Sequence, residues 1–223
     1  MTKTAAPMTS GSIWKQMTFF AMPIFLGNLF QQLYNTVDSL IVGNFLGSSA
    51  LAAVSSSGSL IFMLIGFLSG ISAGAGVIVA RFFGAGDEKN LQRAVHTTVA
   101  FGLVAGVLMT GVGVALSPQI LRWMDTPESV MRESVTYLQI YFAGSLGFVM
   151  YNVLVGILQA VGDSRHPLYY LIVSSVINLV LDLLFITGFH TGVEGAAVAT
   201  VISQIVSALL CFWQLLRTKE SYG

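Results

Sequence analysis

Charge is scarce in this 223-residue chain. Only 9% of its residues are Asp, Glu, Lys or Arg, whereas a soluble domain carries roughly 25%. The ten basic and ten acidic residues cancel to a formal net charge of zero, and no basic arm suggests a nucleic-acid partner. Hydrophobic residues make up 55% of the chain. This balance is typical of a protein that resides in a lipid bilayer.

Cysteine and catalytic motifs are equally scarce. Cys211 is the only cysteine, which excludes an intrachain disulfide framework and a cysteine-rich metal site. The sequence contains no HExxH zinc motif, no serine in a nucleophile-elbow context and no phosphate-binding loop that ends in Lys-Ser or Lys-Thr. We therefore expect no enzyme, and no cofactor apart from an ion.

Six segments have the roughly 20 mostly apolar residues that a membrane-spanning helix needs. They lie at about 13–45, 50–80, 94–116, 134–159, 168–189 and 195–216. No small-residue cleavage site follows the first apolar stretch, so we predict a span there and no signal peptide. Pro23 lies inside this span and is a candidate hinge, because proline removes a helix hydrogen bond. The fold class predicted is all-α, polytopic and membrane-embedded.

An even number of spans places both termini on one side of the membrane. Basic residues are concentrated on that side, which the positive-inside rule assigns to the cytoplasm. That side would hold Lys3, Lys15, Arg81, Lys89, Arg93, Arg165, Arg217 and Lys219, against Arg122 and Arg132 outside. We predict a multi-pass plasma-membrane (inner-membrane) protein with a cytoplasmic tail at 1–12, a six-helix lobe at 13–217 and a second tail, or the start of a linker, at 218–223.

Glycines recur every four residues on two predicted spans, a spacing that allows helices to approach closely. Gly66, Gly70 and Gly74 form one such row, and Gly102 and Gly106 form another. We predict that both rows pack against neighbouring helices.

Two carboxylates inside lipid-compatible segments are the main functional signal. A charged side chain at the bilayer centre costs at least about 2.5–3.5 kcal/mol, and such residues usually mark an ion or substrate pathway. Asp38, Asp182 and Thr200 each lie five or six residues from a predicted outer helix end, about 8–9 Å deep. Asn178 lies one turn deeper than Asp182. A purely structural hydrogen bond between helices remains an alternative.

Further polar residues share helical faces with these acids, which indicates a watery cavity inside the bundle. The predicted cavity-lining residues are Asn28, Gln31, Asn35, Asn152, Ser174 and Gln204. Acids shielded from water must take up a proton or bind a cation. Carboxylate, amide and hydroxyl oxygens are hard ligands, so Asp38, Asn178, Asp182 and Thr200 could bind H⁺ or Na⁺.

Several motifs, spread along the chain in the family's order, resemble those of multidrug and toxic compound extrusion (MATE) transporters. Residues 32–43, QLYNTVDSLIVG, resemble the first-helix signature of that family, and residues 81–86, RFFGAG, resemble the loop after its second helix. Residues 159–163, QAVGD, resemble the loop after the fourth helix. Residues 178–182 and 192–200 resemble its fifth and sixth helices.

The resemblance implies export of drugs or other amphipathic, often cationic, organic compounds, driven by H⁺ or Na⁺. It also implies a cation site in the N-terminal lobe, on Asp38, Asn178, Asp182 and Thr200. Family members have twelve helices in two lobes, so this chain resembles an N-terminal lobe that needs a second six-helix lobe, either a C-terminal half or a second copy.

Two alternatives remain open at this stage. A lipid-linked sugar flippase of the same superfamily would need a basic cavity for pyrophosphate, and the interior of the predicted spans supplies no Lys or Arg. A truncated half-protein that transports nothing is the other alternative, with acids that only pack.

Overall fold

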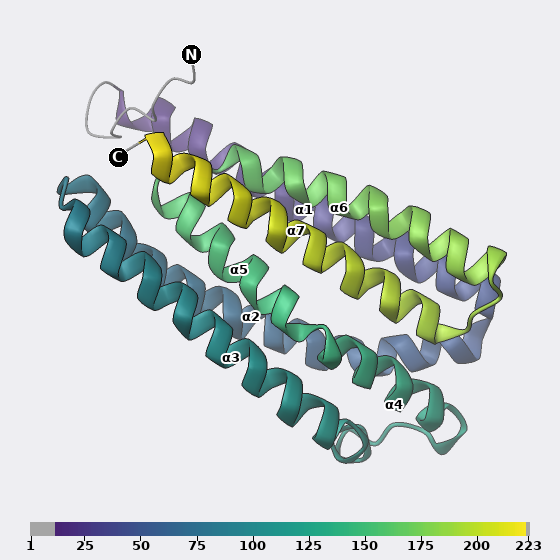
Figure 1. Ribbon diagram of the computed structural model, residues 1–223. Helices are drawn as coiled ribbons and strands as arrows, with labels where there is room; N and C mark the ends of the chain where they lie inside the picture. Colours follow the sequence, from purple (N-terminus) through teal and green to yellow (C-terminus); the bar gives the residue numbers. More distant parts are fainter. Residues whose placement is uncertain (1–11, 222–223) are drawn as a thin grey trace.

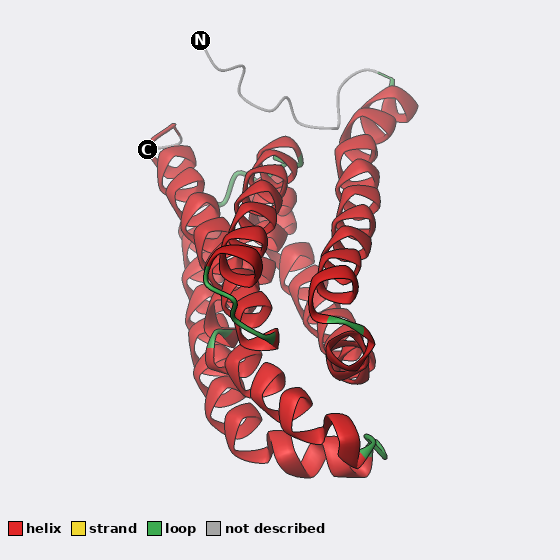
Figure 2. Cartoon of the chain, turned by 90° about the vertical axis from the view of Figure 1, so that its right-hand side faces the viewer, coloured by secondary structure: helices red, strands yellow, loops and turns green. Residues whose placement is uncertain are grey.

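A computed structural model describes the backbone of residues 12–221 and the side chains of residues 12–217. The described chain consists of helices and short loops, without strands (Figure 2). This confirms the all-α prediction. The predicted tails at 1–12 and 218–223 lie outside the described residues, apart from Ser12 and the backbone of 218–221.

Seven α-helices and one π-helical turn make up the described chain. They are α1 (Ile13–Leu46), α2 (Ser48–Gly84), α3 (Glu88–Trp123), α4 (Glu128–Ala143), α5 (Ser145–Ala160), α6 (Arg165–Leu183) with its extension η1 (Leu184–Gly188), and α7 (Val193–Ser221). The predicted segments overlap all of these helices, but the segment at 94–116 begins six residues after the start of α3 and ends seven residues before its end.

Four helices of the described chain are long and apolar enough to cross a membrane. They are α2, α3, α6 together with η1, and α7; the pair α4 and α5 makes a fifth if it counts as one span. α1 is not among them, although it is 34 residues long. The structure therefore supports four or five apolar spans, fewer than the six predicted.

The span predicted at 134–159 consists of two helices, α4 and α5, with a bend of 51° between them. The bend falls at Gly144, where an added Cβ would lie 2.3 Å from a methyl group of Val201. On the next residue, Ser145 Oγ lies 2.9 Å from Oγ1 of Thr110 in α3. The bend is thus fixed by contacts with α7 and α3.

α5 lies at the centre of the bundle and packs against α2, α3 and α7. Figure 1 shows α1, α6 and α7 along one side and α2 with α3 along the other. The start of α1, the α2–α3 turn, the α5–α6 turn and the end of α7 share one end of the bundle (Figure 1). We call it the terminal end.

The two glycine rows behave differently. On α3, a Cβ at Gly102 would lie 3.0 Å from Val153, and one at Gly106 would lie 2.6 Å from Leu146, so this row packs against α5 as predicted. The α2 row, Gly66, Gly70 and Gly74, has no neighbour within 4 Å of an added Cβ. That prediction is wrong within this chain.

Helix α2 packs through a different face. An added Cβ at Gly156 of α5 would lie 3.1 Å from the carbonyl oxygen of Ser72, and one at Gly76 would lie 3.4 Å from the carbonyl oxygen of Gly156. Close approach of α2 to α5 therefore uses Ser72 and Gly76. The same four-residue spacing occurs on both faces of α2, so spacing alone could not choose between them.

Candidate functional site

A large cavity of about 1320 Å³ runs through the bundle between α1, α2, α5, α6 and α7. It extends from Asp38 and Val54 to Gly84 and Gly162 at the terminal end. All six residues that the sequence predicts to line a cavity do so in the structure, as does the candidate hinge Pro23: Pro23, Asn28, Gln31, Asn35, Asn152, Ser174 and Gln204. Whether they contact a substrate stays a prediction.

The cavity wall is polar but almost uncharged. Among its described lining residues, Asp38 is the only one with a formal charge, and none is Lys or Arg. Aromatic rings of Tyr34, Tyr137, Tyr141 and Tyr151 contribute to the same wall. A cavity of this composition suits an amphipathic organic molecule, because rings and amides provide apolar surface with dispersed hydrogen-bonding groups.

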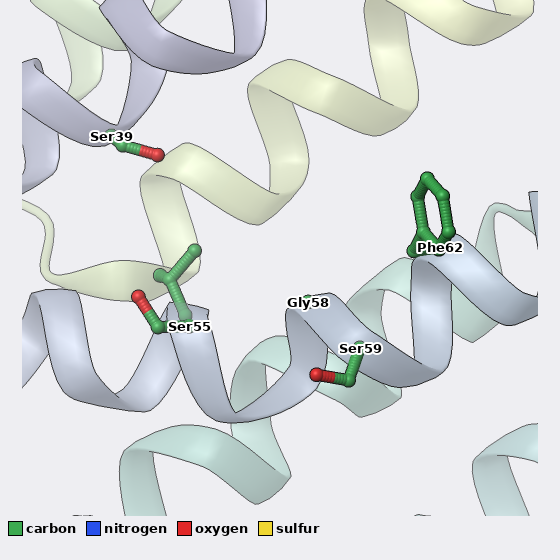
Figure 3. A pocket seen from close by; sticks show the side chains of 6 residues that line it. Ser39, Ser55, Gly58, Ser59 and Phe62 are labelled. Atoms are coloured by element: carbon green, nitrogen blue, oxygen red, sulfur yellow. The ribbon is translucent and has the colours of Figure 1, made fainter.

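A side notch of about 530 Å³ opens from the cavity where α1 and α2 diverge. Figure 3 shows Ser39 of α1 opposite Ser55, Gly58 and Ser59 of α2, with Phe62 further along α2. Four residues line both spaces: Ser39, Val54, Gly58 and Phe62. The cavity is thus bounded incompletely on the α1–α2 side.

A half-buried acid, Asp38, and a fully buried one, Asp182, lie together at one wall of the cavity. Asp38 projects from α1 and Asp182 from α6, and the two carboxyl groups lie close enough to interact with one another. A direct hydrogen bond between them would require a proton on one carboxyl group, since carboxylates only accept. Asp182 is completely inaccessible to solvent, and Oδ1 of each acid is buried without a protein hydrogen-bond partner.

Asn178 and Thr200 complete this cluster. The Asn178 side chain is also fully buried, and its amide lies 3.4 Å from Oγ1 of Thr200 on α7. With its nitrogen oriented toward the acid, the amide donates to Oδ2 of Asp182 at 2.8 Å and its oxygen accepts from the Thr200 backbone N–H at 3.1 Å. This orientation is assigned from the hydrogen-bond pattern, because the opposite one would direct the amide oxygen at a carboxylate.

The structure therefore brings together the four residues that the sequence selected for ion coupling. They come from three helices and offer carboxylate, amide and hydroxyl oxygens within one water-shielded cluster. Those donors fit a proton shared between the acids, or a small hard cation. No group of three or more His, Cys, Asp or Glu side chains that could hold a metal ion occurs among the described residues, so any cation site here would depend on Asn178 and Thr200 as well as the acids.

Tyr34 is the site residue that sequence reasoning missed. Its hydroxyl lies 3.1 Å from the Asn178 amide, and Thr200 is close enough to interact with it. Tyr34 lies one helical turn before Asp38, so the spacing that linked Asn35 to Asp38 could have included it.

The other tyrosines differ in where they lie. Tyr137 and Tyr141 are buried on α4 near the acid pair, and Tyr141 lies close to Gln204. Tyr169 is 55% exposed on α6, and Tyr170 donates a hydrogen bond to Gln214. Neither of these two lines the cavity.

An α-helical bundle with apolar spans, a polar internal cavity and a shielded acid pair defines the class of polytopic membrane transporters. Within that class, the sequence model of the MatE family matches residues 23–184, and the chain belongs to this family.

Known relatives agree with this membership. The chain is 37% identical to the "Probable multidrug resistance protein YoeA" of Bacillus subtilis (strain 168) over 213 residues, which cover 94% of this chain and 46% of that protein. The relative is named for multidrug resistance and not for a catalysed reaction, in agreement with the prediction that the chain is no enzyme. The chain spans about half the length of the curated relatives it matches.

Two solved structures differ in how well the chain superposes on them. An outward-facing multidrug resistance MATE family transporter of the MOP superfamily matches with a TM-score of 0.89 at 28% identity, over 100% of this chain and 49% of that one. An inward-facing one matches with a TM-score of 0.78 at 30% identity, over 83% of this chain and 42% of that one.

Proposed function

We propose that this chain forms one six-span half of a cation-coupled exporter of drugs or other amphipathic, often cationic, organic compounds. The observation that carries the proposal is the contact between Asp38 and Asp182 at the wall of the cavity. Two acids in contact cannot both be ionised without a cation between them. Uptake of H⁺ or Na⁺ is therefore linked to the geometry of the cavity wall.

The sixth span of this proposal is α1. Its low apolarity is explained by the polar residues that it presents to the cavity, such as Gln31, Asn35 and Asp38, because a membrane helix tolerates polar groups that face an internal aqueous space. With six spans, both termini lie on the same side. Arg81, Arg165 and their basic neighbours at the terminal end support a cytoplasmic assignment for that end in the plasma membrane.

The substrate class follows from the wall of the cavity. An organic cation would be attracted to the faces of the tyrosine rings and to the carboxyl group of Asp38. A lipid-linked pyrophosphate would find no Lys or Arg on the described wall, which argues against the flippase alternative. The open side between α1 and α2 and the half-length match support a second six-helix half, whether a C-terminal partner or a second copy.

The test is transport in proteoliposomes that contain the purified chain and a fluorescent organic cation, with an imposed pH or Na⁺ gradient. We expect gradient-driven dye movement to be lost in Asp38→Asn and Asp182→Asn. Asp125→Asn makes the same chemical change in the α3–α4 loop, at a positive φ of 53° that Asn tolerates, and should leave transport intact. Full transport in both acid variants would refute the coupling.

A second outcome would show whether the chain needs a second six-helix half for transport. Dye that binds the purified chain in detergent without gradient-driven movement would indicate that six helices bind substrate but need a partner to transport it. The gradient that drives movement, H⁺ or Na⁺, would identify the coupling ion.

A further inference from the structure

A second polar cluster lies at the terminal end, apart from the acid pair. Asp163 lies in the turn between α5 and α6, His166 and Tyr170 lie in the first turns of α6, and Gln214 lies near the end of α7. His166 Nδ1 lies 2.7 Å from Oδ2 of Asp163. None of these four side chains lines the cavity.

The cluster joins segments that are distant in sequence. Asp163 accepts from the backbone N–H of His166 at 3.2 Å, from the imidazole Nδ1–H, and from Nε2 of Gln214 at 3.4 Å. The Tyr170 hydroxyl donates to Oε1 of Gln214 at 3.0 Å. Gln214 is 51 residues from Asp163, so these bonds tie the start of α6 to α7 at two points.

The cluster fastens the chain segment that forms the end wall of the cavity. Val161, Gly162, Ser164 and Pro167, on both sides of Asp163 and His166, all line the cavity. Loosening the tie between this turn and α7 would free that wall to move. Tightening it would keep the wall closed against the bundle.

His166 is the group in this cluster whose charge can change, because a neutral imidazole has a second ring nitrogen that can take up a proton. The acidic group facing it is Asp163. Arg165 precedes it in the chain, Tyr169 and Tyr170 contact its ring from α6, and α7 brings Cys211 and Arg217 close to Tyr170. The Arg217 guanidinium lies 3.8 Å from the Trp213 ring centroid, over its face.

We propose that Asp163, His166, Tyr170 and Gln214 form a pH-sensitive clasp that fastens the end wall of the cavity to α7, and that protonation of His166 tightens it. Nδ1–H donates to Asp163 whether the ring is neutral or charged, so the bonds persist in both states. Protonation adds the attraction of a full positive charge at 2.7 Å. The clasp itself does not depend on transport; its effect on transport rests on the proposed function and the cytoplasmic assignment of this end.

Amide hydrogen exchange of the full chain in detergent tests the clasp directly. The peptide covering residues 164–171 is followed at pH 5.5 and pH 8, and each rate is divided by the intrinsic rate for that pH. The His166 and Asp163 side chains are 42% and 19% exposed, so the charge pair is partly screened. We expect opening to be roughly 1.5- to 5-fold rarer at pH 5.5.

Three variants separate the effect of the His166 charge from the effect of the hydrogen bond to α7. His166→Asn keeps an N–H donor near Asp163 but cannot gain charge, so its opening ratio between the two pH values should fall to one. Tyr170→Phe removes one hydrogen bond to α7 and should raise opening about 2- to 10-fold at both pH values. His190→Asn makes the same substitution at an exposed loop histidine with φ 52° and should behave like the wild type.

Two results would overturn the proposal. One is a wild-type ratio of one, or a ratio that His166→Asn retains. The other is unchanged opening in Tyr170→Phe, which would mean that the turn is not fastened to α7 through this bond. Because exchange is measured without a substrate gradient, failure of the clasp is distinct from failure of the transport proposal.

Discussion

Two glycines with the same sequence context should respond oppositely to alanine. Gly106 on α3 and Gly70 on α2 both belong to four-residue glycine rows in mid-helix. An added Cβ at Gly106 would lie 2.6 Å from Leu146 Cδ1 and 3.1 Å from its backbone Cα. At Gly70 no atom of a neighbouring element lies within 4 Å.

The magnitude follows from two opposing effects. Alanine in mid-helix is favoured over glycine by about 0.8–1.0 kcal/mol, and this gain applies equally at both positions. Overpacking against a backbone atom that cannot rotate away costs about 1–3 kcal/mol, and it applies only at Gly106. The helix gain cancels in the comparison, so Gly106→Ala should be less stable than Gly70→Ala by about 1–3 kcal/mol.

Thermal unfolding of the 223-residue chain in detergent measures this difference. For a chain of 150–250 residues, 1 kcal/mol corresponds to about 2–4 °C, so the two midpoints should differ by roughly 2–12 °C. Gly70→Ala should match or exceed the wild type. Equal midpoints for the two variants, or a loss at Gly70, would refute the assignment of α2's packing face to Ser72 and Gly76.

Two further predictions concern hydrogen bonds. Tyr34→Phe removes the hydroxyl that bonds with Asn178, and should lower the free energy of unfolding by about 0.5–1.5 kcal/mol in the same thermal assay; an unchanged midpoint would argue against that bond. Hydrogen bonds from the Asn90 side chain and backbone lower the pKa of the Asp87 carboxyl in the α2–α3 turn. The cap therefore stabilises α3 above the ordinary carboxyl pKa and is lost as pH falls through the lowered folded-state value. Exchange at residues 88–91 should accelerate, relative to intrinsic rates, in strong acid, and Asp87→Asn, which caps at every pH, should show no such acceleration.

The sequence predicted the helices and the site cluster because both depend on strong local signals. Long apolar segments located the helices, and the rarity of Asp38 and Asp182 in such segments selected the acids. Depth along each helix then grouped Asn178 and Thr200 with them. Helical periodicity also selected the cavity face, since a polar side chain in a membrane bundle has few places to point.

What escaped prediction depends on contacts between distant segments. The bend at Gly144 arises where Val201 and Thr110 approach it, and neither contact has a signal in the sequence around Gly144. The prediction that the α2 glycine row packs against another helix was wrong for the same reason. Four-residue spacing identifies a smooth helix face, but it does not identify which helix packs on that face. Tyr34 was missed because tyrosine is also common as an interfacial anchor.

One constraint, that buried polar groups need partners, accounts for both the low apolarity of α1 and the burial of Asp182 on α6. Asn178 and Asp182 are fully buried, so their polar groups need partners inside the bundle. α1 supplies Asp38 and Tyr34, and its Asn28, Gln31, Asn35 and Ser39 line the same cavity. A helix that carries so many polar groups fails the apolarity expected of an isolated span. It is compatible with a membrane only when α6 and α2, its main packing partners, shield that face. The polar residues that lower the apolarity of α1 are therefore the residues that it contributes to the site. The same residues make the membrane insertion of α1 depend on its packing against neighbouring helices.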